Sequence, residues 1–110
     1  GMKKARPGLD AQADVEKAVL YYTGQSLGAA QLFIGEYKMT IAAIERMPGT
    51  GSPRFAHELG IASLRTRSIH RFPYLIFYFE HSRYIDIVRI LHMHRDIPNL
   101  LSRVGGIEGI

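Results

Sequence analysis

The stretch FPYLIFYFEHSRYIDIVRILH, residues 72–92, decides the fold of this chain. It holds two runs, 73–80 and 84–91, that are rich in aromatic and β-branched residues, the types that favour strands. The four polar residues from Glu80 to Arg83 lie between these runs and predict a hairpin loop. The stretch therefore predicts two neighbouring antiparallel strands.

A third strand is expected just before this hairpin. Over residues 63–70, Leu64 and Thr66 alternate with Arg65 and Arg67, which is the period of two of a strand with one buried face. The basic residues 3–7, which end at Pro7, predict a short edge strand, because proline is tolerated only at strand ends and edges.

Two amphipathic helices are expected between the first strand and the other three. The first covers 11–24, with Asp10 as N-cap and Gly24 near its end, and its apolar residues repeat on one face: Val15, Ala18, Val19 and Tyr22. The second covers 27–47 and is ended by Pro48-Gly49. Its apolar stripe is Ala30, Phe33, Ile34, Tyr37, Ile41 and Ile44, and its polar residues Glu36, Lys38, Glu45 and Arg46 are expected to face away.

The remaining segments complete an α+β fold. Residues 48–62 carry the Gly, Pro and Ser content of a loop, and Asp96-Ile97-Pro98 predicts a short helical turn. Helices that precede a run of antiparallel strands imply a helical hairpin packed on one face of a twisted antiparallel sheet, in the order β-α-α-β-β-β.

The length of 110 residues fits one domain, which we place at 2–104, followed by a flexible tail at 105–110. Gly1 before Met2 is interpreted as the remnant of a cleaved tag. The chain has no cysteine, no apolar run long enough to span a bilayer and no signal peptide at its start, so we expect a cytoplasmic protein.

The positive charge is unevenly distributed. The net charge is +4, the four lysines precede residue 40, and from Phe55 onward the basic residues other than histidine are all arginine. Arginine suits bidentate contacts to phosphate or carboxylate, so this pattern favours an acidic partner, either nucleic acid or protein. A generally solvated surface would explain the same pattern.

Arg89 is the most informative single residue. Strict alternation would place it on one strand face with Ile85, Ile87 and Leu91, where a charge needs a partner. That partner is either Asp96 or a helix C-terminus within the fold, or an acidic ligand.

Two histidines follow the last strand. His92 and His94 would share a face if the strand continued, but no third ligand stands at a usual metal spacing, so we expect no metal site and no cofactor. Either ring could act as a general base near neutral pH or lie hydrogen-bonded at the rim of the sheet.

A basic stripe precedes the central strand. Arg65, Arg67, His70 and Arg71 lie near the aromatics Phe72 and Tyr74, a combination that can hold single-stranded RNA. A solvated sheet face with tyrosine in the core is the alternative. The residue types alone indicate a basic α+β domain with an arginine-rich sheet.

These residues resemble the RelE/ParE superfamily of type II toxins, and its ParE branch (plasmid stabilisation proteins) in particular. The similarity is carried by residues 72–78, by Ile87 to His92 and by Arg95-Asp96-Ile97-Pro98. Upstream, Ala13-Asp14-Val15 to Tyr21-Tyr22 is similar to the first helix of that branch. The segment 48–53 and Leu64-Arg65 are similar to its loop and second strand, so that the resemblance spans roughly 3–101.

The resemblance implies a toxin that causes growth arrest and is neutralised by a small acidic antitoxin. This antitoxin is expected to be partly disordered, to begin with a ribbon-helix-helix segment and to bind operator DNA for the complex, which could be a heterotetramer or larger. ParE-like members are associated with poisoning of DNA gyrase, whereas RelE-like members cut mRNA at the ribosome. An inactive relative that only binds its antitoxin is a third reading.

Site residues depend on which activity applies. For the target or the antitoxin we predict contacts from Arg65, Arg67, Arg71, Arg89, His92, His94 and Arg95. A metal-independent ribonuclease would use Arg71, Arg89, His92 and Tyr74. The lysine-rich site of the ribonuclease branch is missing, because residues 63–80 contain no lysine, and the non-enzymatic toxin is therefore favoured.

Overall fold

The computed structural model describes residues 2–102 and 104. Along the chain lie β1 (Lys4–Pro7), α1 (Leu9–Gln25), α2 (Leu27–Arg46), the 3-10 turn η1 (Pro48–Thr50), α3 (Arg54–Leu59), β2 (Arg65–Ser68), β3 (Tyr74–Glu80), β4 (Tyr84–His92) and α4 (Ile97–Leu100). The expected α+β order is confirmed. The tag remnant at Gly1 and the tail at 105–110 lie outside the described residues.

The four strands form one sheet in the order β1-β4-β3-β2. The pairs β2–β3 and β3–β4 are antiparallel, as expected, but β1 runs parallel to β4, with Lys4 opposite Tyr84 and Pro7 opposite Ile87. The sheet is therefore mixed rather than wholly antiparallel. The long connection from β1 to β4, which runs through the helical hairpin, α3, β2 and β3, makes the parallel pairing possible, because parallel neighbours need a crossover rather than a tight turn.

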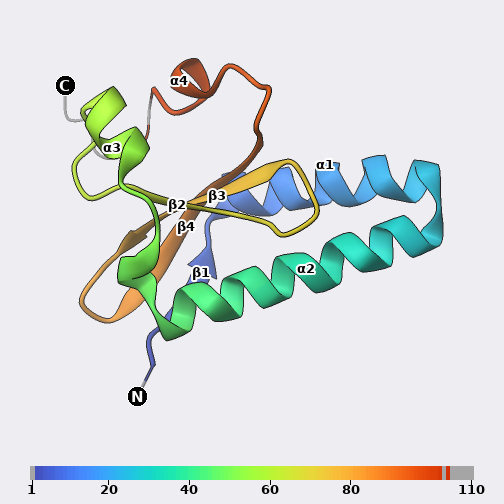
Figure 1. The fold of residues 1–110 in the computed structure, drawn as a ribbon, viewed down its shortest axis with the longest axis horizontal. Helices are drawn as coiled ribbons and strands as arrows, with labels where there is room; N and C mark the ends of the chain where they lie inside the picture. Colours follow the sequence, from blue (N-terminus) through green and yellow to red (C-terminus); the bar gives the residue numbers. More distant parts are fainter. Residues whose placement is uncertain (1, 103, 105–110) are drawn as a thin grey trace.

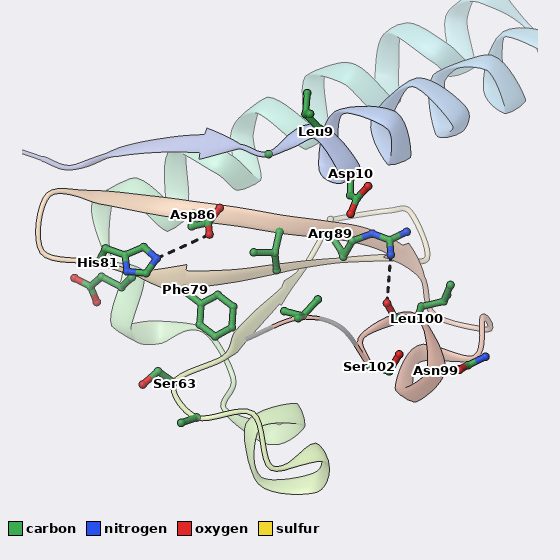
Figure 2. Close-up of a pocket in the computed structure, with 15 residues that line it drawn as sticks. Leu9, Asp10, Ser63, Phe79, His81, Asp86, Arg89, Asn99, Leu100 and Ser102 are labelled. Carbon is green, nitrogen blue, oxygen red and sulfur yellow. Dashed lines mark hydrogen bonds and ion pairs between the residues drawn. The ribbon is translucent and has the colours of Figure 1, made fainter. Parts of the chain in front are cut away.

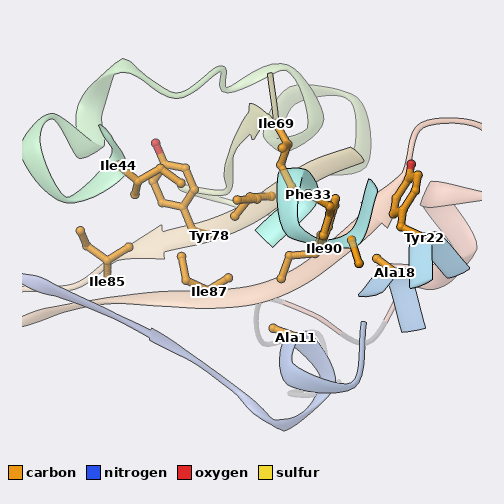
Figure 3. Packing of buried hydrophobic residues seen from close by; sticks show 12 residues of the cluster. Ala11, Ala18, Tyr22, Phe33, Ile44, Ile69, Tyr78, Ile85, Ile87 and Ile90 are labelled. Atoms are coloured by element: carbon orange, nitrogen blue, oxygen red, sulfur yellow. The ribbon is translucent and has the colours of Figure 1, made fainter. Parts of the chain in front are cut away.

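The helical hairpin covers one face of this sheet, and α3 and α4 lie on its other side (Figure 1). The core between hairpin and sheet contains Ala18, Tyr22, Phe33 and Ile44 from the helices (Figure 3). The predicted apolar stripes are thus the buried faces of α1 and α2. Two of the predicted polar positions differ, because Glu36 is half-buried and Glu45 accepts the backbone N–H of Ala5 at 2.8 Å.

The other face carries a smaller apolar cluster. Phe55 of α3 packs against Phe77 of β3 with ring centroids 5.2 Å apart, and Ile97 and Leu101 from the C-terminal segment join them. The prediction of a loop over 48–62 is therefore wrong, since this segment contains η1 and α3. A helix of six residues is too short to show helical periodicity, and α3 is stabilised by packing rather than by propensity.

The start of α1 also differs from the prediction. The N-cap is Gly8 and no side chain caps the helix, so Asp10 lies within the first turn rather than before it. A carboxylate there still interacts favourably with the helix N-terminus. Gly24 does not end α1, which continues to Gln25.

Ser26 lies between α1 and α2 and is the N-cap of α2, and we expect Ser26→Ala to lower the free energy of unfolding by about 1 kcal/mol. Its Oγ accepts the N–H of Ala29 at 2.9 Å and so caps α2. Urea denaturation of the two proteins measures the change. Ser82→Ala, at an exposed position of the hairpin loop, is the control, and an equal loss there would contradict the capping role.

Candidate functional site

Arg89 lies on β4 at an irregularity of the β3–β4 ladder. Phe77 is opposite Arg89, whereas the next residue, Tyr78, is opposite Ile87. Val88 is consequently an extra residue on β4, and the pair contains a β-bulge. A bulge reverses the alternation of side chains beyond it and re-aims the residues beside it.

The bulge changes which residues share a face with Arg89. Ile85, Ile87 and Ile90 all pack into the core beneath the helical hairpin. Leu91 belongs to the cluster on the other face. The expectation that Arg89 lies in line with Ile85 and Ile87 is therefore wrong, because it assumed unbroken alternation. Leu91, which follows Arg89 by two residues beyond the bulge, does share its face.

The guanidinium of Arg89 forms a bidentate salt bridge with the carboxylate of Asp14 on α1. Its Nε and Nη2 donate to Oδ2 and Oδ1 of Asp14 at 2.7 and 2.9 Å. Only 19% of the Arg89 side chain and 10% of the Asp14 side chain are exposed. This hydrogen bonding to Asp14 raises the pKa of Arg89 above its ordinary value, although burial opposes the shift.

A third donor of Arg89 reaches the C-terminal segment. Nη1 donates to the carbonyl oxygen of Leu100, the last residue of α4, at 3.3 Å. Of the partners expected within the fold, the helix C-terminus is thus confirmed, and the carboxylate is Asp14 rather than Asp96. Asp14 was missed because nothing in its local sequence distinguishes it from the other polar residues of α1.

Asp14 also completes an open strand edge. β1 ends at Pro7, opposite Ile87, so no strand among the described residues lies beside the rest of β4 on that side. Oδ2 of Asp14 accepts the backbone N–H of Ile90 at 2.9 Å and takes the place of the missing strand at that position. One carboxylate therefore connects α1 to β4 and, through Arg89, to α4.

One groove runs over the outer face of the sheet, between β3, β4 and the C-terminal segment (Figure 2). Its volume is about 990 Å³, and Arg89 and Leu100 line one end. Asp86 lies farther along, with its Oδ2 3.9 Å from Nε2 of His81. The groove also contains Asp10 and Glu80, so its charge is mixed rather than basic. We call it the outer-face groove.

A second hollow, of about 440 Å³, lies between α1 and the C-terminal half of β4. Its polar lining includes Lys17, Tyr21, Tyr74, Arg89, His92 and Arg95. We call it the α1–β4 hollow. It brings together four of the predicted site residues, Tyr74, Arg89, His92 and Arg95, and adds Lys17 and Tyr21, which the sequence did not single out.

The rings of Tyr74 and His92 meet edge-on in this hollow, with centroids 5.2 Å apart. Tyr74 also packs edge-on against the buried rings of Tyr22 and Phe33. Burial raises the pKa of Tyr74 above its usual value, and the nearby charge of Arg95 opposes this shift. Tyr74 is accordingly a weak proton donor near neutral pH.

The imidazole of His92 contacts the turn that follows β4. Its Nδ1 accepts the backbone N–H of His94 at 3.1 Å, so in this arrangement the neutral ring carries its proton on Nε2. β4 ends at His92, and His94 lies in the turn rather than on the same strand face. The two rings are nevertheless close, with centroids 5.3 Å apart.

The other three predicted arginines lie elsewhere. Arg65 donates to the carbonyl oxygen of Gly51 at 2.7 Å, and Arg67 donates to the hydroxyl of Thr50 at 2.8 Å. Nε of Arg71 lies 4.0 Å from Oε2 of Glu36 on α2. None of the three lines the α1–β4 hollow.

Over residues 2–102 and 104, no three His, Asp or Glu side chains are grouped closely enough to hold a metal ion. Within the same residues, no helix has the length and apolar character that crossing a membrane requires.

The fold and the site together define a class: small basic α+β domains with a helical hairpin on a short sheet and a hollow beside the last strand. Residues 9–97 match the sequence model of the family described as the ParE toxin of the type II toxin–antitoxin system parDE, and the chain belongs to this family. It is therefore a type II toxin, and membership implies an antitoxin partner.

A solved structure supports the same fold. The chain is similar to one described as the chromosomal ParDE TA system from P. aeruginosa, with a TM-score of 0.68 and 18% sequence identity. The similarity covers 84% of this chain and 98% of that chain. No curated protein sequence matches the chain significantly.

Proposed function

We propose that this toxin arrests growth by binding DNA gyrase in the cytoplasm, without cutting nucleic acid itself. One observation carries the non-enzymatic part: Asp14 already occupies two prongs of Arg89, the arginine that a nuclease would use. The choice of gyrase rests on the association of ParE-like toxins with that enzyme.

The arrangement of the other candidate groups supports this proposal. A metal-free ribonuclease needs a cation free to stabilise the charge on phosphorus and groups that move protons. Arg71 lies beside Glu36 and outside the hollow that contains Tyr74, Arg89 and His92. Tyr74, with its raised pKa, is poorly suited to donate a proton. The four residues of the ribonuclease hypothesis are thus not gathered around one reacting atom.

The antitoxin is proposed to occupy the α1–β4 hollow. Lys17 and Arg95 provide positive charge there, and Tyr21, which is 60% exposed, provides apolar surface. An acidic segment that becomes ordered on binding would meet both features. Neutralisation would then follow from covering His92, His94 and Arg95, which we propose as contacts to gyrase.

We expect the purified protein to inhibit supercoiling of relaxed plasmid by gyrase and to trap cleaved DNA on the enzyme. His94→Ala/Arg95→Ala should reduce this inhibition about tenfold, because it removes exposed polar contacts of the proposed interface. Arg83→Ala, at an exposed site in the β3–β4 loop, is the matched control. Unchanged supercoiling at a molar excess of folded protein would rule out gyrase as the target.

A second candidate, an mRNA endonuclease, is favoured by one observation: Tyr74, Arg89 and His92 do line a common hollow. Primer extension on translated mRNA after induction distinguishes the two. New 5′ ends that disappear with His92→Ala would establish the nuclease. Growth arrest without such ends supports the gyrase proposal, and absence of any growth arrest would indicate an inactive antitoxin-binding relative.

A further inference from the structure

We propose that a separate basic hollow beside β2 binds the sugar–phosphate backbone of duplex DNA. The hollow has a volume of about 710 Å³ and lies where the end of α2, η1, the start of α3 and β2 meet. We call it the β2 hollow. It shares no lining residue with the α1–β4 hollow, so the two can be occupied independently.

Four cationic or potentially cationic side chains from different segments converge on this hollow. Arg46 comes from α2, Arg54 from α3, Arg67 from β2, and His70 from the loop after β2. None of the described residues that line the hollow is acidic. Three arginine side chains together with no lining carboxylate make this concave surface suited to an anion.

These side chains keep donors available for a ligand. Nη1 of Arg67 donates to the Thr50 hydroxyl. Among the described residues, no carboxylate lies within 4.0 Å of the guanidinium of Arg67 or of Arg46. Arg54 does pair with Glu58 at 3.3 Å, yet both side chains are more than half exposed, so this pair is weak and easily exchanged. His70 is the exception, because its Nδ1 lies 3.5 Å from Oε1 of Glu36.

The character of the walls favours duplex DNA over single strands. Single-stranded nucleic acids are held by bases that stack on exposed aromatic rings. The aromatic ring in the described lining is Phe55, which is only 6% exposed. Phe72 and Tyr74, which the sequence placed beside the arginines, instead pack against the core. What remains are contacts to phosphate, which is how proteins hold a duplex without reading its sequence.

The strand edge argues against an acidic peptide. A peptide commonly binds such a place by adding a strand to the sheet. The outer edge of β2 is already occupied at Thr66, whose N–H and carbonyl both bond to the backbone of Ser52, at 2.9 and 2.8 Å. A peptide would have to displace that bridge, whereas a phosphate backbone needs only the side chains.

The test is fluorescence anisotropy of a short labelled DNA duplex over a range of KCl concentrations. We expect Arg46→Gln/Arg54→Gln/Arg67→Gln to weaken binding about tenfold or more at low salt. The slope of log affinity against log salt should fall by about 0.9 for each phosphate contact removed, that is, by between 2 and 3. The matched control is Lys4→Gln/Arg6→Gln/Arg83→Gln, which removes the same charge at exposed positions.

Thermal melts check that both triple variants are folded. If the triple variant that contains Arg46→Gln does not fold, the single variant Arg46→Gln is measured instead, with Lys4→Gln as its control. Equal weakening by variant and control would overturn the proposal, because net charge alone would then explain binding. The proposal would also be overturned if single-stranded RNA of the same length bound more tightly than the DNA duplex. The same holds if polyglutamate displaced the labelled duplex as well as unlabelled duplex does. None of these three results bears on gyrase inhibition, which the supercoiling assay tests separately.

Discussion

Replacing Asp14 by alanine is expected to lower the free energy of unfolding by about 3 kcal/mol. The change removes both acceptors of the Arg89 fork and leaves that guanidinium largely buried without a counter-charge. It also removes the acceptor of the Ile90 N–H at the open edge of β4. The loss should be large because an unpaired charge in a buried position costs more than the ion pair contributes when intact.

Urea denaturation of the wild type, Asp14→Ala and Asp14→Ala/Arg89→Met measures this effect. The double variant should be more stable than the single one, because methionine carries no charge that needs a partner. Glu16→Ala is the control, since Glu16 lies on the same helix but is exposed. A loss below about 1 kcal/mol for Asp14→Ala would show that water replaces the carboxylate without difficulty.

Gly51→Ala is expected to destabilise the protein by about 3 kcal/mol, through overpacking and the loss of one hydrogen bond. A Cβ at position 51 would come within 2.1 Å of the Tyr78 hydroxyl oxygen and 2.8 Å of its Cζ. Tyr78 is fully buried, and its hydroxyl donates to the carbonyl oxygen of Pro48 at 2.6 Å. The ring therefore cannot move aside without breaking this bond and disturbing the core.

A double variant tests whether the contact with Tyr78 causes the loss of stability. Gly51→Ala/Tyr78→Phe should recover part of the loss, because phenylalanine lacks the oxygen that the new methyl group would meet first. Gly49→Ala is the matched control, since nothing lies within 4 Å of a Cβ built there. If Gly49→Ala and Gly51→Ala lower the stability equally, the close contact is not the reason.

The sequence predicted well the elements whose pattern lies within one continuous stretch of residues. The stripes on α1 and α2 are long enough to show a period, and the two strand runs after residue 72 are rich in the residue types that favour strands. α3, with six residues, is too short to show one. The parallel direction of β1 depends on a pairing with Tyr84 to Ile87, about which residues 4–7 carry no local information.

The candidate site shows the same division. Arg89 was identified because a charge among aliphatic residues requires a partner, and that partner exists. The identity of the partner could not be predicted, since Asp14 and Arg89 are 75 positions apart and meet only because of the bulge and the early end of β1. Contacts of the predicted arginines and histidines with gyrase or an antitoxin stay a prediction, which the assays described above test.

The pairing of β1 with β4 has a consequence for the synthesis of the protein. Lys4 leaves the ribosome before its neighbour in the sheet, Tyr84, which is made 80 positions later (84 minus 4). The first strand and α1 must therefore wait for most of the chain before their partners exist, and non-local pairing of this kind slows folding. Each newly made toxin molecule thus passes through a period in which its sheet is incomplete, and a partner present during that period meets the chain before it is fully formed.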